Sequence, residues 1–232
     1  MEKVCIPLWR APADAPATAD ALLPLVSSSS GLRGATVHVE APEHDALRHG
    51  SGERLLTGLL SLWVDSYQDL DLTALRADPP AGDAYLVSES VPQPYGEAFT
   101  WSEGERSPGL SMVTLLDKPA DVSEPEFYRA WHGLHRLTTA ECHPFTSYVR
   151  NEIVRPLTPG APAYRGIVTE SAPEVEDFTD PDRFYVSGGD PDRLRANQQR
   201  VVGEIVQFID LHSMQVAPMA EYVVRRLSGT SP

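Results

Sequence analysis

The chain has 232 residues, of which 41% are hydrophobic, so it is long enough to bury a substantial core as one large domain or two smaller ones. Its formal net charge of -14 argues against binding to nucleic acid or to an anionic membrane surface, because both require clustered Lys and Arg and the 19 basic residues form no such cluster. No apolar stretch approaches the ~18 residues that a membrane span needs.

The cysteines and the N-terminus indicate where the protein works. Cys5 and Cys142 could form at most one disulfide bond. The first residues, MEKVCIPLW, lack the basic start and apolar core of a signal peptide. We therefore expect a soluble protein in the reducing cytoplasm.

Hydrophobic periodicity in residues 1–105 predicts a mixture of strands and helices. The predicted order is strand 3–9, helix 18–27, strand 33–41, strand 54–64, helix 68–77 and strand 84–92. Pro24 favours a short or kinked first helix. The apolar run 54–64 fits a buried strand or a helix, and its Gly-rich flanks and terminal Trp63 favour the strand.

The same order of elements returns in residues 106–232. The predicted order there is strand 110–116, helix 123–139, strand 146–154, strand 164–171, helix 192–211 and strand 219–227. This repetition predicts an internal duplication with a boundary near residue 105. An acidic loop at 174–192 enlarges the second unit, and it is either a lid or a solvated insertion, of which its charge favours the insertion.

Two tandem βαββαβ units predict an α+β protein. A ferredoxin-like unit of this kind has an antiparallel sheet with both helices on one face, which leaves the other face apolar and uncovered. An isolated unit would expose that face and aggregate. We therefore expect the two sheets to pack together as a single-chain dimeric α+β barrel.

The helix predicted at 123–139 is the most informative segment. Ser123 and Glu126 form a capping box, and Pro125 lies where a missing N–H has no cost. At ~100° per residue, one apolar stripe is expected, which His132 lies outside. The stripe consists of Phe127, Ala130, Trp131, Leu134 and Thr138, with Tyr128 and His135 beside Trp131.

A Tyr, a Trp and a His along one edge of a buried helix face indicate a partly polar cavity. We predict that His135 acts as a general base and that Tyr128 is its hydrogen-bonding partner. Trp131 is expected to form an aromatic wall, and Phe127 and Tyr148 complete the predicted substrate-binding set. The alternative is a core histidine that hydrogen-bonds a backbone carbonyl.

Several other polar residues have a functional and a structural interpretation. Asp210 is a candidate catalytic residue, because it could orient a histidine, although an Asp at that position often caps a turn. Arg150 and Glu152 share a strand face that borders a cavity or, more simply, faces solvent. A solvated strand face also accounts for His38.

The sequence predicts neither a metal nor a cofactor. His132 and His135, with Glu141, Cys142 and His143 nearby, resemble a ligand cluster, but the first two point about 60° apart on a helix. No GxGxxG, GxxxxGK or CxxC motif is present, which argues against nucleotides and iron–sulfur clusters. Haem remains an alternative, because a helix histidine facing a cavity is a suitable proximal ligand. A purified protein without colour would exclude the haem alternative.

The second unit resembles the EthD-like members of the dimeric α+β barrel superfamily over residues 110–225. The matching positions are Lys118, Phe127, Trp131, His135, Tyr148, Gly166, Glu204, Phe208 and Asp210. Two features depart from the family pattern. Thr169 occupies a position that is usually acidic, with Glu170 one residue later, and the first unit has no His in its first helix. The resemblance therefore implies a site in the second unit only.

This resemblance implies several activities, because the superfamily includes polyketide cyclases, dehydratases, cofactor-free oxygenases and haem proteins. Our leading hypothesis is a cofactor-independent lyase, cyclase or dehydratase of secondary metabolism that acts on a small apolar carbonyl or polyketide-like compound. The alternatives are a cofactor-free oxygenase and a non-catalytic small-molecule binding protein. The sequence leaves open whether the barrel pairs further as a homodimer.

Overall fold

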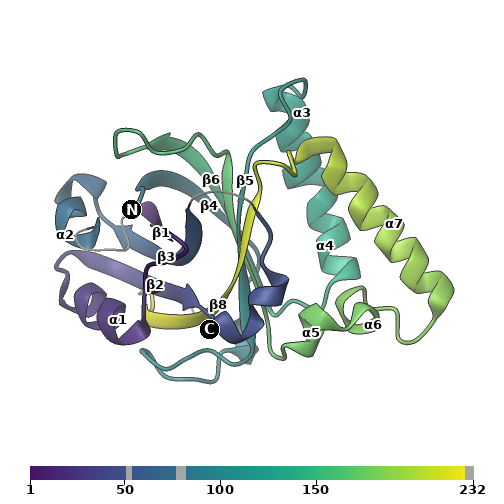
Figure 1. The fold of residues 1–232 in the computed structure, drawn as a ribbon, viewed down its shortest axis with the longest axis horizontal. Helices are drawn as coiled ribbons and strands as arrows, with labels where there is room; N and C mark the ends of the chain where they lie inside the picture. The colour runs from purple at the N-terminus through teal and green to yellow at the C-terminus, as the bar shows by residue number, and fades with distance from the viewer. Residues whose placement is uncertain (51–53, 77–81, 228–232) are drawn as a thin grey trace.

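A computed structural model describes residues 1–50, 54–76 and 82–227. In this part of the chain, eight antiparallel strands form a closed barrel with the helices outside it (Figure 1). The strands are β1 (Glu2–Arg10), β2 (Leu32–Glu40), β3 (Leu55–Val64), β4 (Tyr85–Gln93), β5 (Leu110–Leu116), β6 (Ser147–Pro156), β7 (Gly166–Ala172) and β8 (Gln215–Arg225). Each lies at a position where the sequence predicts a strand, including the ambiguous run 54–64.

The order of strands around the barrel is β1-β3-β2-β8-β5-β7-β6-β4. Residues 1–105, the first half, contribute the neighbouring strands β4-β1-β3-β2, and residues 106–232, the second half, contribute β8-β5-β7-β6. Antiparallel pairing of β2 with β8 and of β4 with β6 joins the two halves. The barrel therefore closes through the edge strands of both halves, and none of the eight strands in the described part of the chain is left as a free edge.

The helices of the first half pack on the outer face of its strands. Helix α1 (Ala19–Ser28) begins at Thr18, whose side chain accepts a hydrogen bond from the Ala21 N–H, and contains Pro24. Helix α2 (Leu72–Arg76) is shorter than predicted and follows a 3₁₀ turn, η2 (Tyr67–Asp69). The last residue of the predicted helix, Ala77, lies outside the described residues.

The space beneath α1 and α2 is filled by apolar side chains. Leu22, Val26 and Leu75 of these helices are buried against the strands. The strand side chains in this cluster are Val4, Ile6, Leu8, Leu32, Ala35, Val37, Val39, Leu60, Leu62 and Val64. Full burial of a Leu or Val side chain contributes roughly 1.5–3 kcal/mol, so this layer is a main source of stability for the first half.

The second half carries more helix than the first. One continuous helical segment comprises α3 (Glu124–Tyr128), the π-helix η4 (Arg129–His135) and α4 (Arg136–Cys142), and its capping box is present as predicted. Helix α7 (Pro191–Phe208) ends three residues earlier than expected. Figure 1 shows α4 and α7 on the side of the barrel opposite α1 and α2. The acidic loop is not irregular, because it contains α5 (Glu176–Thr179) and α6 (Pro181–Phe184).

The π-helix changes which residues face the sheet. The predicted stripe includes Leu134, but Leu134 is 58% exposed. A π-helix has more residues per turn than an α-helix, so residues four apart come into line. Phe127, Trp131, His135 and Thr139 are accordingly buried. The expected stripe was therefore wrong at Leu134, and the same change in register turns His135 inward.

Two of the residues predicted to be solvated are buried. His38 is 2% exposed and faces Glu221 across the β2–β8 pair, with its Nε2 atom 3.2 Å from Oε2. Arg150 is 4% exposed, and its Nη1 atom donates a hydrogen bond to the Trp131 carbonyl at 3.0 Å. Both predictions were wrong because closure of the barrel and the second helix layer cover faces that a single strand would expose.

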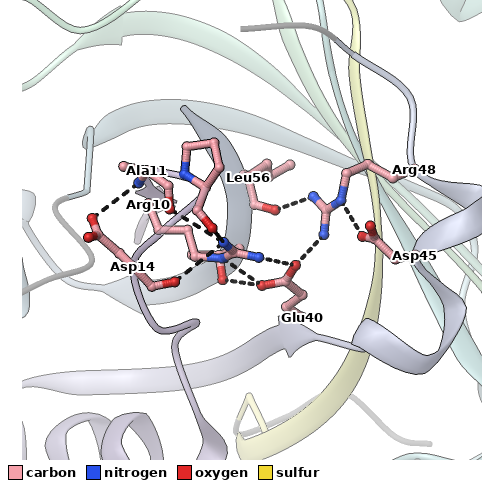
Figure 2. A network of polar contacts seen from close by, with 9 residues as sticks. Arg10, Ala11, Asp14, Glu40, Asp45, Arg48 and Leu56 are labelled. Atoms are coloured by element: carbon pink, nitrogen blue, oxygen red, sulfur yellow. Dashed lines mark hydrogen bonds and ion pairs between the residues drawn. The ribbon is translucent and has the colours of Figure 1, made fainter. Parts of the chain in front are cut away.

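Glu40, at one end of β2, is a buried carboxylate whose oxygens are paired with donors from the first half. Figure 2 shows Glu40 between Arg10 and Arg48. Arg10 donates to both carboxylate oxygens at 3.0 and 3.1 Å, Arg48 donates at 2.6 Å, and Thr57 donates at 2.8 Å. The Glu40 carboxylate is thus hydrogen-bonded at both oxygens, as a buried charge requires.

Three further observations concern the cysteines, the helices and the candidate metal ligands of the described residues. Cys5 and Cys142 are both buried free thiols. Among the described residues, no helix combines the length and the apolar character that crossing a membrane requires. The described residues also contain no group of three or more His, Cys, Asp or Glu placed to hold a metal ion.

Candidate active site

A cavity of ≈ 330 Å³ lies in the second half, between the outer face of its sheet and the helices that cover it. Strands β5 to β8 form one wall, and η4, α7 and the α5–α6 segment form the other. Most of the lining is apolar or aromatic. The lining residues are Leu47, Met112, Thr114, Leu116, Trp131, His135, His143, Phe145, Tyr148, Val168, Glu170, Phe178, Phe184, Tyr185, Val201, Val202, Ile205, Phe208, Ile209, Met214 and Val216. Such a lining suits a small apolar ligand with a few polar groups.

His135 lies at the helical wall of this cavity. Its Nδ1 atom is 3.3 Å from Oε2 of Glu204 on α7. The other oxygen of Glu204 accepts a hydrogen bond from Thr138 at 2.6 Å, and Arg200 lies 3.8 Å from it. A carboxylate beside Nδ1 favours the tautomer that is protonated there, which leaves the Nε2 lone pair free.

The protonation state of His135 follows from burial. Burial lowers the pKa of His135 below its ordinary value of 6.5, and the hydrogen bond and charge of Glu204 oppose this only in part. The imidazole is therefore neutral at neutral pH. Its partner is a carboxylate and not the backbone carbonyl of the alternative interpretation.

Glu170 faces the same cavity from the sheet, and the sequence did not predict it as a site residue. It lies on β7 between Met112 of β5 and Tyr148 of β6, which are its cross-strand partners. Burial raises the pKa of Glu170 to about 7, and no hydrogen bond or opposite charge among the described residues offsets that effect. The signal in the sequence was an acidic residue within the apolar strand predicted at 164–171.

His143 is a third titratable residue at the cavity wall. It follows α4, and its Nδ1 atom lies 2.9 Å from the Phe184 carbonyl oxygen of α6. Its ring stacks on Phe145 with a centroid distance of 5.0 Å. Burial lowers the pKa of His143 to about 4, so the ring is neutral and donates Nδ1–H to that carbonyl.

The predicted aromatic wall is present in part. Trp131 and Tyr148 are buried and line the cavity, whereas Phe127 lies behind Trp131, at a centroid distance of 5.3 Å, and does not. Trp131 lies directly on Gly166, where an added Cβ would collide with the indole ring. Glycine at this position therefore sets how closely the helix approaches the sheet.

Two predicted catalytic residues lie away from the cavity. Tyr128 does not line it, and burial, together with the nearby Glu152, raises the pKa of its hydroxyl to about 12. Asp210 accepts a hydrogen bond from the His212 N–H at 3.1 Å and so closes a turn after α7. The structure brings neither of these residues to His135.

The residues at the cavity do not fit a haem. The free Nε2 atom of His135 is a suitable axial ligand. However, no Lys or Arg is found among the lining residues, all of which the structure describes, so nothing would neutralise the two propionates. The carboxyl of Glu170 would add a further negative charge.

Comparisons with known proteins identify the fold. No protein-family model and no curated protein matches the chain. Among solved structures, an anthrone oxidase-like protein is similar over 100% of this chain and 95% of its own, at 12% identity and a TM-score of 0.60. A chlorite dismutase variant from Candidatus Nitrospira defluvii is similar over 94% of this chain and 90% of its own, at 12% identity and a TM-score of 0.49. At 12% identity, the similarity to the anthrone oxidase-like protein shows the fold alone.

Proposed function

We propose that the protein is a cofactor-independent enzyme that removes a proton from a carbon activated by the carbonyl group of a small apolar, polyketide-like compound, whether that carbon is next to the carbonyl or conjugated with it through an aromatic ring. The observation that supports this most strongly is an imidazole, held at Nδ1 by Glu204, at the wall of an apolar cavity. The free Nε2 atom of His135 takes the C–H proton, and the electron pair moves to the carbonyl oxygen to form an enolate. Cyclisation, dehydration or another lyase step then proceeds from the enolate.

The lining of the cavity supports a neutral, flat substrate. The lining residues include no Lys or Arg, all of them lying within the described chain, so an anionic group would be desolvated without compensation. Trp131, Phe145 and Tyr185 offer aromatic surfaces on which a planar ring can stack. A compact aromatic ketone meets both requirements.

Proton abstraction can be tested with anthrone, a tricyclic ketone with an acidic methylene group. The measurement is deuterium exchange of that methylene in D₂O under nitrogen, followed by NMR, for the wild type and for His135→Gln. Loss of a general base costs roughly 10²–10⁴-fold in rate, so the variant should lose most of the exchange above background. His132→Gln is the matched control, because His132 lies on the same helix but does not line the cavity.

Two results would contradict the proposal. One is wild-type exchange by His135→Gln. The other is a wild-type protein that gives no exchange above the uncatalysed rate.

A second candidate is a cofactor-free oxygenase. The observation that favours it is the similarity, over the whole chain, to a protein described as anthrone oxidase-like. The first step is the same, because the carbanion formed by His135 is the species that would react with O₂. Stoichiometric consumption of dissolved oxygen in air-saturated buffer distinguishes this reaction from an enolisation that uses none.

A third candidate is a non-catalytic carrier in the cytoplasm, which would bind anthrone without exchanging its methylene protons.

We also propose a finer description of the fold. Two tandem ferredoxin-like units are supported by the corresponding strand orders β4-β1-β3-β2 and β8-β5-β7-β6, whereas the EthD-like character of the second unit rests on its sequence resemblance alone. Further pairing as a homodimer is compatible with this arrangement.

A further inference from the structure

Glu170, half-buried in the cavity wall, differs from the buried glutamates Glu40 and Glu221 because its side chain has no hydrogen-bond partner among the described residues. Glu40 is held by two arginines and Thr57. Glu221 accepts hydrogen bonds from Tyr95 at 2.9 Å and Ser107 at 2.8 Å, and also faces His38. The carboxyl group of Glu170 makes no hydrogen bond to any of the described residues. An unpartnered carboxyl in an apolar cavity requires an explanation, because burying a polar group without a partner is costly.

The surroundings of Glu170 favour its neutral form. Four titratable residues face the cavity with it, namely Tyr148 from β6, His135 from η4, His143 after α4 and Tyr185 after α6. Strands β5 and β8 and helix α7 contribute apolar side chains and one threonine. Both histidines have lowered pKa values and are neutral at neutral pH, so no cation stabilises a carboxylate here. A neutral carboxyl, unlike a carboxylate, has an O–H group to donate.

We infer that Glu170 is the second catalytic group of this cavity and donates its proton to the carbonyl oxygen of the substrate while His135 removes the C–H proton. This inference rests on the proposed function. In the step, the C–H bond breaks and its proton moves to Nε2 of His135. The electron pair passes through the conjugated ring to the carbonyl group, whose C=O bond becomes a C–O single bond as the oxygen takes the proton of Glu170. The product is the enol, with an imidazolium at His135 and a carboxylate at Glu170. Return of the imidazolium proton to the carboxylate through solvent restores both groups.

The pair defines a class of substrate. The base belongs to the helical wall of the cavity and the acid to the sheet. A substrate must therefore present its acidic carbon to one layer and its carbonyl oxygen to the other. Neutral aromatic ketones in which the two lie at opposite edges of one ring, as in anthrone, meet this condition. An enol such as 1-naphthol is the corresponding product-like ligand.

The pH dependence of anthrone exchange tests the role of Glu170. In the wild type, the rate should rise with pH below 6.5, as His135 loses its proton, and fall as pH rises through about 7, as Glu170 loses its own. Glu170→Gln should lower the rate about 10²-fold and abolish the alkaline fall. Glu152→Gln, on β6 away from the cavity, should behave as the wild type.

Infrared difference spectroscopy gives a readout that needs no substrate. The C=O stretch of a protonated carboxyl should be present in the wild type at pH 6, disappear as pH rises through about 7, and be absent from Glu170→Gln. Absence of that band at pH 6 would overturn the inference, as would a Glu170→Gln variant with the wild-type rate and profile. An exchange rate of the wild type that rises as pH increases through 7 would also overturn the inference, because the active form of Glu170 would then be the carboxylate, which acts as a base. Each of these results concerns Glu170 and could be obtained while His135→Gln still lost its exchange activity. Failure of the inference can therefore be distinguished from failure of the proposed function, which His135→Gln tests.

Discussion

The two halves of the barrel have corresponding strand orders, but the space between the outer face of the sheet and its helices is filled in the first half and hollow in the second. In the first half, α1 and α2 pack on the sheet and apolar side chains fill the space between them. In the second half, the π-helix, α7 and the α5–α6 segment enclose a cavity of ≈ 330 Å³. Because one half already supplies a filled core, the other can keep a hollow that would destabilise a protein built from that half alone.

The same difference is visible in one glutamate from each half. Glu40 is buried and surrounded by donors from Arg10, Arg48 and Thr57 (Figure 2). Glu170 faces the cavity with no donor among the described residues. Removal of the charge should therefore destabilise the protein at Glu40 and stabilise it at Glu170, which makes the comparison measurable.

The largest effect is expected at Glu40. Glu40→Gln leaves the half-buried Arg10 and Arg48 without their carboxylate, and breaking a buried ion pair from one side costs roughly 3–5 kcal/mol. Urea denaturation at pH 7 measures this loss. Asp65→Asn is the control, because its pair with Arg33 is exposed, and it should leave the free energy of unfolding unchanged. Equal effects of the two substitutions would mean that the Glu40 cluster does not stabilise the first half.

Glu170→Gln should have the opposite sign. The pKa of Glu170 is raised from 4.5 to about 7, so the folded wild type loses stability as pH rises from 4.5 through 7. At about 1.4 kcal/mol per pH unit, this loss amounts to about 3 kcal/mol. The variant should match the wild type near pH 4 and be more stable above pH 7, as measured by denaturation at both pH values. A variant less stable than the wild type at pH 8 would show that the ionised carboxyl has a partner.

His143 should give a similar effect on the acid side. Its pKa is lowered from 6.5 to about 4, so the wild type loses stability as pH falls from 6.5 through 4, by about 3 kcal/mol. His143→Gln keeps a donor for the Phe184 carbonyl but does not titrate. Its free energy of unfolding should fall less than that of the wild type between pH 7 and pH 4. Parallel curves for the two proteins would indicate that His143 is solvated.

The smallest effect is expected at the contact between helix and sheet. Gly166→Ala places a Cβ against the Trp131 ring, and overpacking of this kind costs typically 1–3 kcal/mol. Gly203→Ala in α7 is the matched control, because nothing lies near its added Cβ and alanine favours a helix by ~1 kcal/mol. Relative to the wild type, the midpoint of thermal unfolding should be lower for Gly166→Ala and higher for Gly203→Ala. An unchanged midpoint of thermal unfolding for Gly166→Ala would show that the Trp131 ring can move away from the added Cβ.

The strands and the start of the second-half helix could be predicted from the sequence because their signals are local. Alternation of side chains defines a strand such as β3, and the capping box of Ser123 and Glu126 defines a helix start within four residues. The π-helix has no such signal, so the exposure of Leu134 was predicted wrongly.

The candidate site was predictable only in part. His135 and Trp131 belong to one helix, so periodicity could bring them together. Glu170, His143 and Tyr185 come from separate elements that meet only in the folded chain. The burial of His38 likewise depends on pairing between β2 and β8, because its cross-strand partner Glu221 is 183 residues later in the chain. Contacts of this range leave no pattern in a local stretch of sequence.

The most direct test of the account is a crystal structure of the protein with 1-naphthol at pH 6. The account predicts electron density for the ligand in the second-half cavity, stacked on the aromatic wall, with its oxygen within hydrogen-bonding distance of Glu170 and a ring carbon facing Nε2 of His135. No ligand should enter the filled layer beneath α1 and α2. A second-half cavity closed by its own side chains, or naphthol bound only elsewhere, would contradict the account.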